Sequence, residues 1–303
     1  PGGLLRYGIP DFKLEKSVLD RRLRVMEAAG IVFETGVEIG RDLAARYLLG
    51  RFAGVILAGG VREPRDLRVP GRELAGIHFA LDYLGQQNRR DAGLAVAPEE
   101  SIDARDRDVV IIGGGDTGAD CWGTARRQGA RRIAQLEILP PPPAERPPDA
   151  PWPEWPRRLR DTSDRAEEGE RRWSVMTRRF EGVGGRVARV HAVEVDWAPN
   201  AAGRVEPRER PGTDFSISAD LVLLAMGFTG PGPQPIVEQL GLETDERGYV
   251  RRRGTNGTSR PNVWVAGDMA HGPGLVVRAL ADGLQAAVNC LAMLGEGPSD
   301  HGV

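Results

Sequence analysis

The stretch VVIIGGGDTGADC, residues 109–121, constrains the fold of this chain more than any other part of its sequence. Four apolar residues run into glycines spaced as G-x-G-x-x-G, at Gly113, Gly115 and Gly118, and a helix-forming segment follows. In such a loop the first glycine permits a tight turn, and the second lets a pyrophosphate approach the backbone. The third lets the helix pack against the strand, and the helix N-terminus supplies amides and a positive dipole. The pattern predicts a strand–loop–helix unit that binds a dinucleotide.

The residues around the loop strengthen this prediction, because the glycine spacing alone is a weak signal. Residues 108–112 read as the preceding strand, Gly129 stands where the helix should end, and RIAQLEIL (132–139) reads as the next strand. A glycine turn with a purely structural role is the alternative. The predicted nucleotide-binding residues of the loop are Gly113, Gly115, Asp116, Thr117 and Gly118.

Glu137 comes about 20 residues after Gly118, near the end of the second predicted strand, where an acid binds the ribose 2′-hydroxyl of NAD and repels a 2′-phosphate. We therefore favour NADH over NADPH and predict that Glu137 binds the cofactor. The alternative is that Glu137 points into solvent. NADPH remains an alternative cofactor, because four arginines lie close in sequence: Arg126, Arg127, Arg131 and Arg132.

A second strand, glycine loop and helix stand in VWVAGDMAHGPGLVVRALADGLQAA, residues 263–287. Asp268 ends the strand, and the helix that begins near Leu275 presents its N-terminus to a second anion. Two such units flanking a middle region predict an α/β chain with two nucleotide sites, or parts of two.

Composition excludes several other classes. The chain has 303 residues, 40% of them hydrophobic, and a net charge of −2, so we expect neither a nucleic-acid nor a membrane partner. The longest apolar run, 219–228, is interrupted by Asp220 and is shorter than the roughly 20 residues that span a bilayer. A signal-peptide pattern is missing, so we expect a cytoplasmic protein. Because the chain begins at Pro1, we expect it to be a fragment.

The cysteines and histidines indicate no metal site. The two cysteines, Cys121 and Cys290, are fewer than the about four thiolates of an iron–sulfur cluster, and they form no C-x-x-C dithiol. The four histidines match no zinc-enzyme pattern, and a G-x-S-x-G hydrolase motif is missing.

The remaining elements are read from periodicity. We expect a helix capped by Ser17 and running to about Ala29, and a strand over IVFETGVEI (31–39). A short strand is expected in 52–60 and a helix around 75–88. The alternating segments 187–197 and 214–227 are expected to be strands joined by a turn. The proline-rich stretch 139–156 is expected to be a polyproline-type surface segment.

Five long stretches carry a resemblance to a known family. They are PGGLLRYGIPDFKLEK (1–16), GIHFALDYLGQQNR (76–89), VVIIGGGDTGADCWGTARRQGA (109–130), PPDAPWPEWPRRLR (147–160) and ADLVLLAMGFTGP (219–231). In this order they resemble the small (beta) subunit of glutamate synthase over nearly the whole chain. The Pro-Trp stretch is far more specific than the glycine spacing.

The resemblance implies the fold and the cofactors. It implies an α/β fold of two interleaved Rossmann-like domains, with residues 1–102 and 226–303 binding FAD and residues 103–225 binding NAD(P)H. The glycine loop would bind the nicotinamide cofactor. The residues implied for FAD are Gly2, Gly3 and Leu4, then Gly267 and Asp268 at its ribityl–pyrophosphate region, and Gly274, Leu275 and Val276 near the flavin ring.

This sequence departs from the family pattern at three places. The family's N-terminal region, with its cysteine-rich cluster-binding part and its first FAD glycine fingerprint, would lie before Pro1, so iron–sulfur clusters are expected only there. Pro273 removes one amide donor at the helix implied to meet the flavin, and Arg278 replaces an aromatic residue. ILAGG (56–60) stands where the family has Ala-Thr-Gly. We therefore expect FAD to bind less tightly than the nicotinamide cofactor.

The implied reaction is hydride transfer from NAD(P)H to FAD, with electrons passed on to the glutamate synthase large subunit. Hydride passes directly between the two rings, so we assign no catalytic side chain and no metal. Two alternatives remain open at this point. One is an NAD(P)H reductase of a ferredoxin-like acceptor, and the other is a nicotinamide-binding remnant without turnover.

Overall fold

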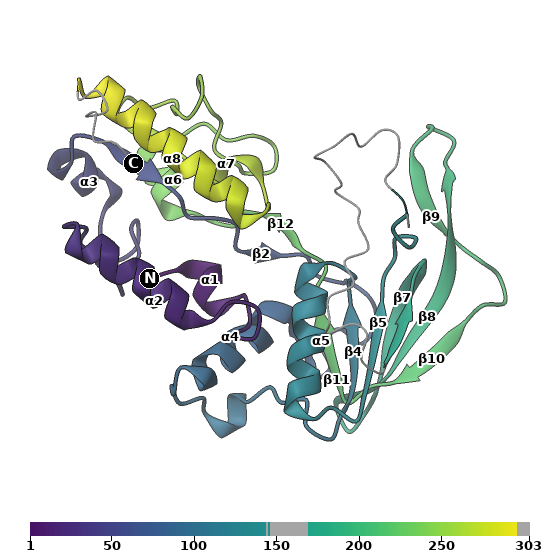
Figure 1. Cartoon of the computed structure of the whole chain (residues 1–303). Helices are drawn as coiled ribbons and strands as arrows, with labels where there is room; N and C mark the ends of the chain where they lie inside the picture. Colours follow the sequence, from purple (N-terminus) through teal and green to yellow (C-terminus); the bar gives the residue numbers. More distant parts are fainter. Residues whose placement is uncertain (144, 146–168, 296–303) are drawn as a thin grey trace. The chain divides into compact units, whose positions relative to one another are not determined.

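The computed structural model describes residues 1–143, 145 and 169–295 (Figure 1). The chain divides into two compact units, and it enters each of them twice. Unit 1 comprises residues 1–31 and 66–226, and unit 2 comprises residues 32–65 and 227–303. The two units are therefore interleaved along the chain, and each consists of two separate segments.

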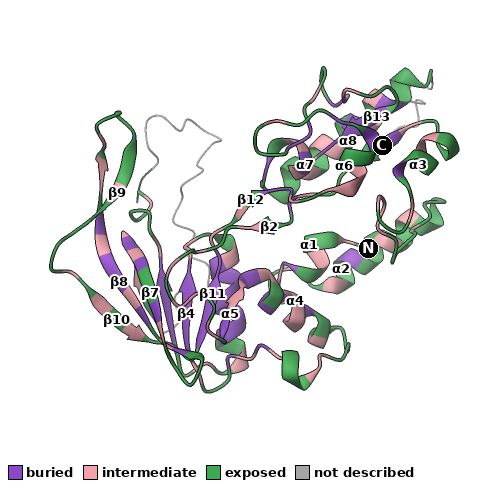
Figure 2. Ribbon diagram, turned by 180° about the vertical axis from the view of Figure 1, so that it is seen from behind, coloured by how far each residue is buried: buried purple, intermediate pink, exposed green. Residues whose placement is uncertain are grey.

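Unit 1 is built on a parallel sheet of five strands in the order β3–β11–β4–β5–β6. The interior strands β11 and β4 are buried at every position, which is typical of a parallel sheet covered on both faces (Figure 2). The strands are β3 (Ile77–Phe79), β4 (Asp108–Ile112), β5 (Arg132–Leu136), β6 (Glu170–Arg172) and β11 (Leu221–Leu224).

Different layers cover the two faces of this sheet. Val109 and Ile111 pack in one cluster with residues of α4 (Ala80–Asp91) and α5 (Asp116–Gln128). Val110 and Ile112 face the other way, into a cluster with residues of an antiparallel sheet. That sheet consists of β7 (Val175–Val183), β8 (Arg186–Pro199), β9 (Val205–Glu209) and β10 (Phe215–Ser218). The other helices of unit 1 are α1 (Gly3–Tyr7), α2 (Lys16–Ala28) and η1 (Pro98–Glu100).

Unit 2 holds a smaller parallel pair, β1 (Val55–Leu57) with β13 (Val263–Val265), and an antiparallel pair, β2 (Glu63–Pro64) with β12 (Phe228–Gly230). Its core gathers residues of β1, β13 and the segments around them. The helices are α3 (Ala45–Arg51), α6 (Pro235–Leu240), α7 (Asp268–His271) and α8 (Val276–Met293).

Helix α8 carries an exposed apolar face. The large apolar side chains with the largest exposed fractions on this helix are those of Val277 (62%), Leu280 (60%), Leu284 (71%) and Met293 (69%). Among the described helices, α8 alone meets the length and composition of a membrane span, with a mean hydropathy of 1.2, and 11% of it is buried. Helices of water-soluble proteins meet the same criteria, so composition assigns this face to no particular neighbour.

Several local predictions are confirmed. The strand 108–112, the helix ended by Gly129 in the left-handed conformation, and the parallel strand that follows all form as expected. Strand β1 lies within 52–60, and β13, the glycine loop and α8 follow in the predicted order. The Pro-Trp stretch falls outside the described residues.

Other local predictions are wrong. Residues 31–39 form no strand; Ile39 makes only an isolated bridge, and Gly36 at φ 75° interrupts the extended backbone. Ser17 lies inside α2, whose N-cap is Glu15. Of the two segments expected to form strands joined by a turn, β8 and β10 do pair in antiparallel fashion, but the turn after β8 leads into β9, and residues 221–224 join the parallel sheet.

The compact units do not follow the predicted cofactor boundaries everywhere. Residues 1–31 and 66–102 belong with the glycine loop, because β3 pairs with β11 and α4 packs on α5 and α1. Contacts define these units and say nothing of which cofactor each one binds. The assignment of 1–102 with 226–303 to FAD and of 103–225 to NAD(P)H stays a prediction.

Candidate functional site

The glycine loop of unit 1 has the geometry expected of a nucleotide-binding turn. Gly113 follows β4 at φ 119°, and a Cβ there would lie 2.2 Å from the carbonyl oxygen of Ala225. A Cβ on Gly118 would lie 2.3 Å from the Gly113 carbonyl oxygen, so a side chain would push α5 away from the strand. By contrast, a Cβ on Gly115 meets no heavy atom within 4 Å among the described residues. The first and third glycines serve packing, and the second borders open space.

Helix α5 begins at the loop. Gly115 is its N-cap residue, and Asp116 and Thr117 form its first turn. The Ala119 amide donates to the Gly115 carbonyl over 3.0 Å, which closes that turn. The structure therefore brings all five predicted loop residues together at one helix N-terminus, where the helix dipole favours an anion.

Glu137 turns toward the loop and not into solvent. Its carboxylate accepts hydrogen bonds from the Gly114 amide and, over 2.8 Å, from the Leu139 amide. The carboxylate is half-buried at the carboxyl end of β5, beside the glycine loop. In dinucleotide-binding domains an acid near this position binds the ribose hydroxyls, and this role of Glu137 stays a prediction.

Two of the nearby arginines have other partners. Arg131 donates to Asp108 and to Asp220, each over 2.8 Å, at the amino end of β4 and away from the loop. Arg127 donates to the Gly123 carbonyl over 2.9 Å and lies 3.7 Å over the ring of Phe12.

The sequence analysis missed Gln135, which contacts the same loop. It lies in β5 and is 0% exposed. Its Nε2 donates to the Gly113 carbonyl over 2.8 Å, and its Oε1 accepts from Nε of Arg171 over 2.9 Å. The only signal in the sequence is an amide within the otherwise apolar run Ile133–Leu136.

The second loop lies in unit 2, between β13 and α8. Gly267 follows the strand at φ 70° and ψ −151°, a conformation that favours glycine, and it is the N-cap of α7. Burial raises the pKa of Asp268, while the hydrogen bond that its carboxylate accepts from the Gly274 amide acts in the opposite direction. This bond joins the two halves of the loop. Five predicted flavin residues therefore lie in one continuous segment: Gly267, Asp268, Gly274, Leu275 and Val276.

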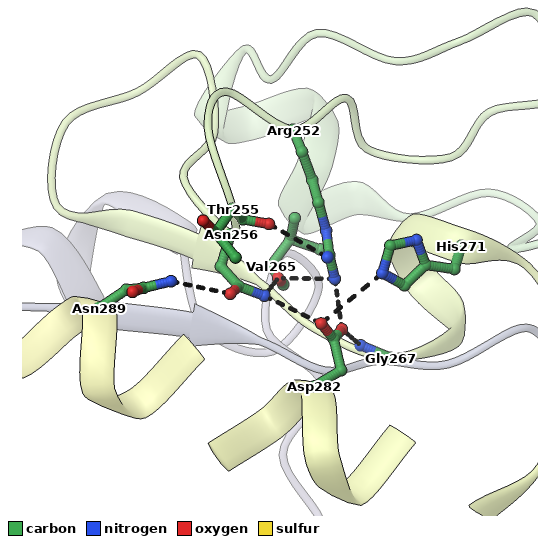
Figure 3. Close-up of polar contacts among 8 residues, drawn as sticks. All are labelled: Arg252, Thr255, Asn256, Val265, Gly267, His271, Asp282 and Asn289. Carbon is green, nitrogen blue, oxygen red and sulfur yellow. Dashed lines mark hydrogen bonds and ion pairs between the residues drawn. The ribbon is translucent and has the colours of Figure 1, made fainter. Parts of the chain in front are cut away.

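Asp282 of α8 is the centre of a polar network beneath this loop (Figure 3). Its carboxylate accepts hydrogen bonds from the backbone amide of Gly267 over 2.6 Å, from the side-chain amide of Asn256 over 3.2 Å, and from the guanidinium of Arg252. Nε2 of His271 lies 3.6 Å from Oδ1 of the same carboxylate. Burial raises the pKa of Asp282, but the hydrogen bonds outweigh burial and lower the pKa to about 2. Asp282 is therefore an anion that fixes the position of the Gly267 peptide.

The remaining predicted flavin residues lie in unit 1. Gly2, at φ 119°, is the N-cap of α1, Gly3 has φ 50°, and Leu4 is 47% exposed. Because they belong to a different unit from Gly267 and Asp268, their part in a common site stays a prediction.

A family model matches most of the chain. Residues 50–283 match the model of the pyridine nucleotide-disulphide oxidoreductases. The chain belongs to this family. Its two cysteines lie in different units and are buried, and burial raises the pKa of both thiols. Within the described part of the chain, His, Cys, Asp and Glu form no group of three that could hold a metal.

The chain is also similar to glutamate synthase chains, which confirms the resemblance. It is 48% identical over 289 residues to the glutamate synthase [NADPH] small chain of Mycobacterium tuberculosis, covering 94% of this chain and 58% of that one. It is 36% identical to a putative small chain of Cereibacter sphaeroides, covering 97% and 69%. It is also 38% identical to glutamate synthase [NADH] of Schizosaccharomyces pombe, covering 95% of this chain and 14% of that one. The chain thus spans a little over half the length of the first of these relatives.

Solved structures confirm the α/β fold. Mycobacterium tuberculosis FprA in complex with NADPH superposes with a TM-score of 0.72 at 20% identity, covering 99% of this chain and 78% of that one. T. acidophilum thioredoxin reductase gives a TM-score of 0.61 at 18% identity, covering 97% and 87%. At these identities the likeness concerns the fold alone.

Proposed function

We propose that this chain carries the NAD(P)H-oxidising part of a glutamate synthase small chain. In this function it passes hydride from NAD(P)H to FAD, and the electrons go on to the glutamate synthase large subunit for glutamate synthesis. The observation that carries the proposal is the glycine loop, in which Gly113 and Gly118 are packed and Gly115 borders open space at the head of α5. The 48% identity to a glutamate synthase small chain supports placing this loop in glutamate synthesis.

The loop residues fit the pyrophosphate of a nicotinamide dinucleotide. Because Gly115 has no side chain, phosphate oxygens can approach the backbone at the N-terminus of α5. The exposed carboxylate of Asp116 and the hydroxyl of Thr117 flank this approach from the first turn of the helix. The task of these residues is to hold and orient the dinucleotide, and none of them needs to move a proton.

Glu137 supports a preference for NADH. Its carboxylate is held beside the loop by two amides, so it accepts a hydrogen bond from a ribose 2′-hydroxyl and repels a 2′-phosphate. The names of the relatives include both NADPH and NADH enzymes. The preference is therefore a property of this chain that binding measurements must establish.

The second loop fits the polar part of FAD. The half-buried carboxylate of Asp268, beside Gly267, is an acceptor for the hydroxyls of a ribityl chain, and Gly274, Leu275 and Val276 lead into α8 next to it. Bound FAD supplies the acceptor for the nicotinamide hydride. Because unit 2 has only a two-stranded parallel sheet and an uncovered α8 in its described part, we propose that this chain holds FAD more weakly than the nicotinamide.

Onward electron transfer requires groups beyond this chain. Two buried cysteines, one in each unit, cannot ligate an iron–sulfur cluster, which takes about four thiolates. We therefore propose that any clusters and the electron acceptor belong to other parts of a glutamate synthase complex, with the large subunit as the partner. We also propose that this chain acts in the cytoplasm.

Anaerobic mixing of the protein with excess FAD and then NADH or NADPH tests the function. We expect loss of the visible flavin absorbance, at a rate that saturates with the nicotinamide concentration. Saturable nicotinamide binding without flavin reduction would identify the chain as a non-catalytic remnant. Reduction of FAD followed by rapid electron transfer from this chain alone to a ferredoxin would favour the ferredoxin-type alternative.

A further inference from the structure

The carboxyl end of β5 holds the glycine loop through three successive residues. Gln135 donates to the Gly113 carbonyl over 2.8 Å, and the Leu136 carbonyl accepts from the Gly113 amide over 2.8 Å. The carboxylate of Glu137 then accepts from the Gly114 amide. Both polar groups of Gly113 are therefore fixed by one strand. The contact of Gln135 depends on its side chain, and Gln135 is not among the residues predicted to bind the cofactor.

Gln135 is an unusual residue for its place. It is completely buried in the parallel sheet, between Ala134 and Leu136, where an apolar side chain would avoid the loss of hydration. Its two amide atoms are instead both hydrogen-bonded, as a buried polar group requires. A Cβ on Gly118 would lie 2.6 Å from Nε2, so the amide is at the junction of strand, loop and helix.

Arg171 of β6 sets the direction of this amide. A guanidinium has donors only, so the atom of Gln135 that faces Nε of Arg171 over 2.9 Å must be the carbonyl oxygen. The amide nitrogen then has to face the Gly113 carbonyl. The relay Arg171–Gln135–Gly113 therefore supports one orientation of the Gly113 peptide. Gly113 has φ 119°, and because glycine populates positive and negative φ about equally, local preference alone does not fix this conformation.

We propose that Gln135 is a positioning residue for nicotinamide nucleotides, acting through the Gly113 peptide on the place where the pyrophosphate binds. This inference rests on the proposed function of the loop. Gln135 does not contact the cofactor in this proposal. It keeps the Gly113–Gly115 backbone in the conformation that the pyrophosphate requires, so that ordering of the loop does not oppose binding.

The test compares two buried amides of unit 1 in the full chain. Gln135→Met keeps the size of the side chain and removes both hydrogen bonds. Asn88→Leu is the matched control, because Asn88 of α4 is 3% exposed and donates to the Ile9 carbonyl over 3.1 Å, outside the loop. Affinities for NADH, NADPH and ADP-ribose are measured by titration, and folding is checked by circular dichroism.

We expect Gln135→Met to weaken binding of all three ligands by a similar factor of about 10, because they share the pyrophosphate and one hydrogen bond is worth roughly that factor. Asn88→Leu should leave all three affinities unchanged. Should Gln135→Met not fold, Gln135→Glu replaces it, since its carboxylate still accepts from Arg171 but, when ionised, cannot donate to Gly113. Unchanged affinities in the folded Gln135 variant, or equal losses in both variants, would overturn the proposal.

Hydrogen exchange separates this inference from the proposed function. If the unmodified chain binds none of the three ligands, the proposed function fails, and exchange in peptides covering 109–121 then decides whether the relay exists. The relay predicts faster exchange there in the Gln135 variant than in Asn88→Leu. Equal exchange rates in the two variants would overturn it.

Discussion

The pair Arg252–Asp282 should be the strongest single polar contribution to the stability of unit 2 among its described residues. The side chains of Arg252 and Asp282 are 16% and 15% exposed, and the carboxylate also accepts from the Gly267 amide over 2.6 Å. Asp282→Asn keeps the shape and an acceptor for Gly267 but leaves the guanidinium without its counter-charge. Glu243→Gln is the matched control, because Glu243 pairs with Arg253 over 2.8 Å, and these side chains are 55% and 60% exposed.

The size of the effect follows from the pKa. A change from 3.8 to about 2 corresponds to roughly 2.5 kcal/mol, which screening near the surface reduces to about 1–2 kcal/mol. Removing one partner of a largely buried pair adds the cost of the isolated charge, so we expect Asp282→Asn to lose about 2–4 kcal/mol. The exposed pair of Glu243 should contribute less than about 1 kcal/mol.

The pH dependence has a defined sign. Because the folded-state pKa of Asp282 lies below its unfolded value, its contribution to stability is complete above about pH 4 and is lost as the pH falls toward 2. The difference in unfolding free energy between the unmodified chain and Asp282→Asn should therefore be constant from pH 8 to about pH 5 and shrink below pH 4.

Hydrogen exchange in peptides covering 263–290 measures this stability locally, and urea unfolding measures it globally. We expect faster exchange at Gly267 in Asp282→Asn and almost none of this effect in Glu243→Gln. Equal effects of the two substitutions, or a difference that does not depend on pH below 4, would refute the reasoning.

Three further predictions follow from single sites. Glu137→Ala should reduce the preference for NADH over NADPH by about 1.5–3 kcal/mol, the worth of a charge-assisted hydrogen bond; tighter binding of NADPH than of NADH by the unmodified chain would contradict the assigned role. Leu284→Glu should change the free energy of unfolding by no more than about 0.5 kcal/mol, because Leu284 is 71% exposed on α8; a larger loss in urea unfolding would show that another surface covers this face. Gly115→Val should abolish nicotinamide binding without unfolding unit 1, because a side chain there enters only open space; normal binding in a titration would show that the loop is misassigned.

The sequence predicts those parts of the fold that depend on local chemistry. The glycine loop is such a part, because the turn at Gly113 and the close packing at Gly118 each require a residue without a Cβ. Gly129 likewise ends α5 in the left-handed conformation that glycine adopts most easily. These requirements are visible in the order of the residues alone.

The parts that the sequence does not predict depend on distant partners. Alternation suggested a strand at 31–39, but a strand needs a neighbour, and Gly36 interrupts the backbone. The short strand β3 was not predicted, because three residues give too little local pattern to indicate a strand. Its hydrogen bonds to β11, which is distant in sequence, stabilise it.

The polar relays beneath the two loops were equally hidden. Gln135 and Arg171 are separated by 36 positions, and Arg252 and Asp282 by 30. Only the folded chain brings these side chains together, and each residue alone reads as an ordinary polar position.

A direct titration of the full chain with NADH and NADPH tests the central claim, that the glycine loop of unit 1 binds a nicotinamide dinucleotide. Gly50→Val in α3 serves as the control for Gly115→Val, because a Cβ on Gly50 likewise meets no described heavy atom within 4 Å. We predict saturable binding by the unmodified chain and by Gly50→Val, and its loss in Gly115→Val. Absence of binding in the unmodified chain, or equal binding in all three proteins, would contradict the claim.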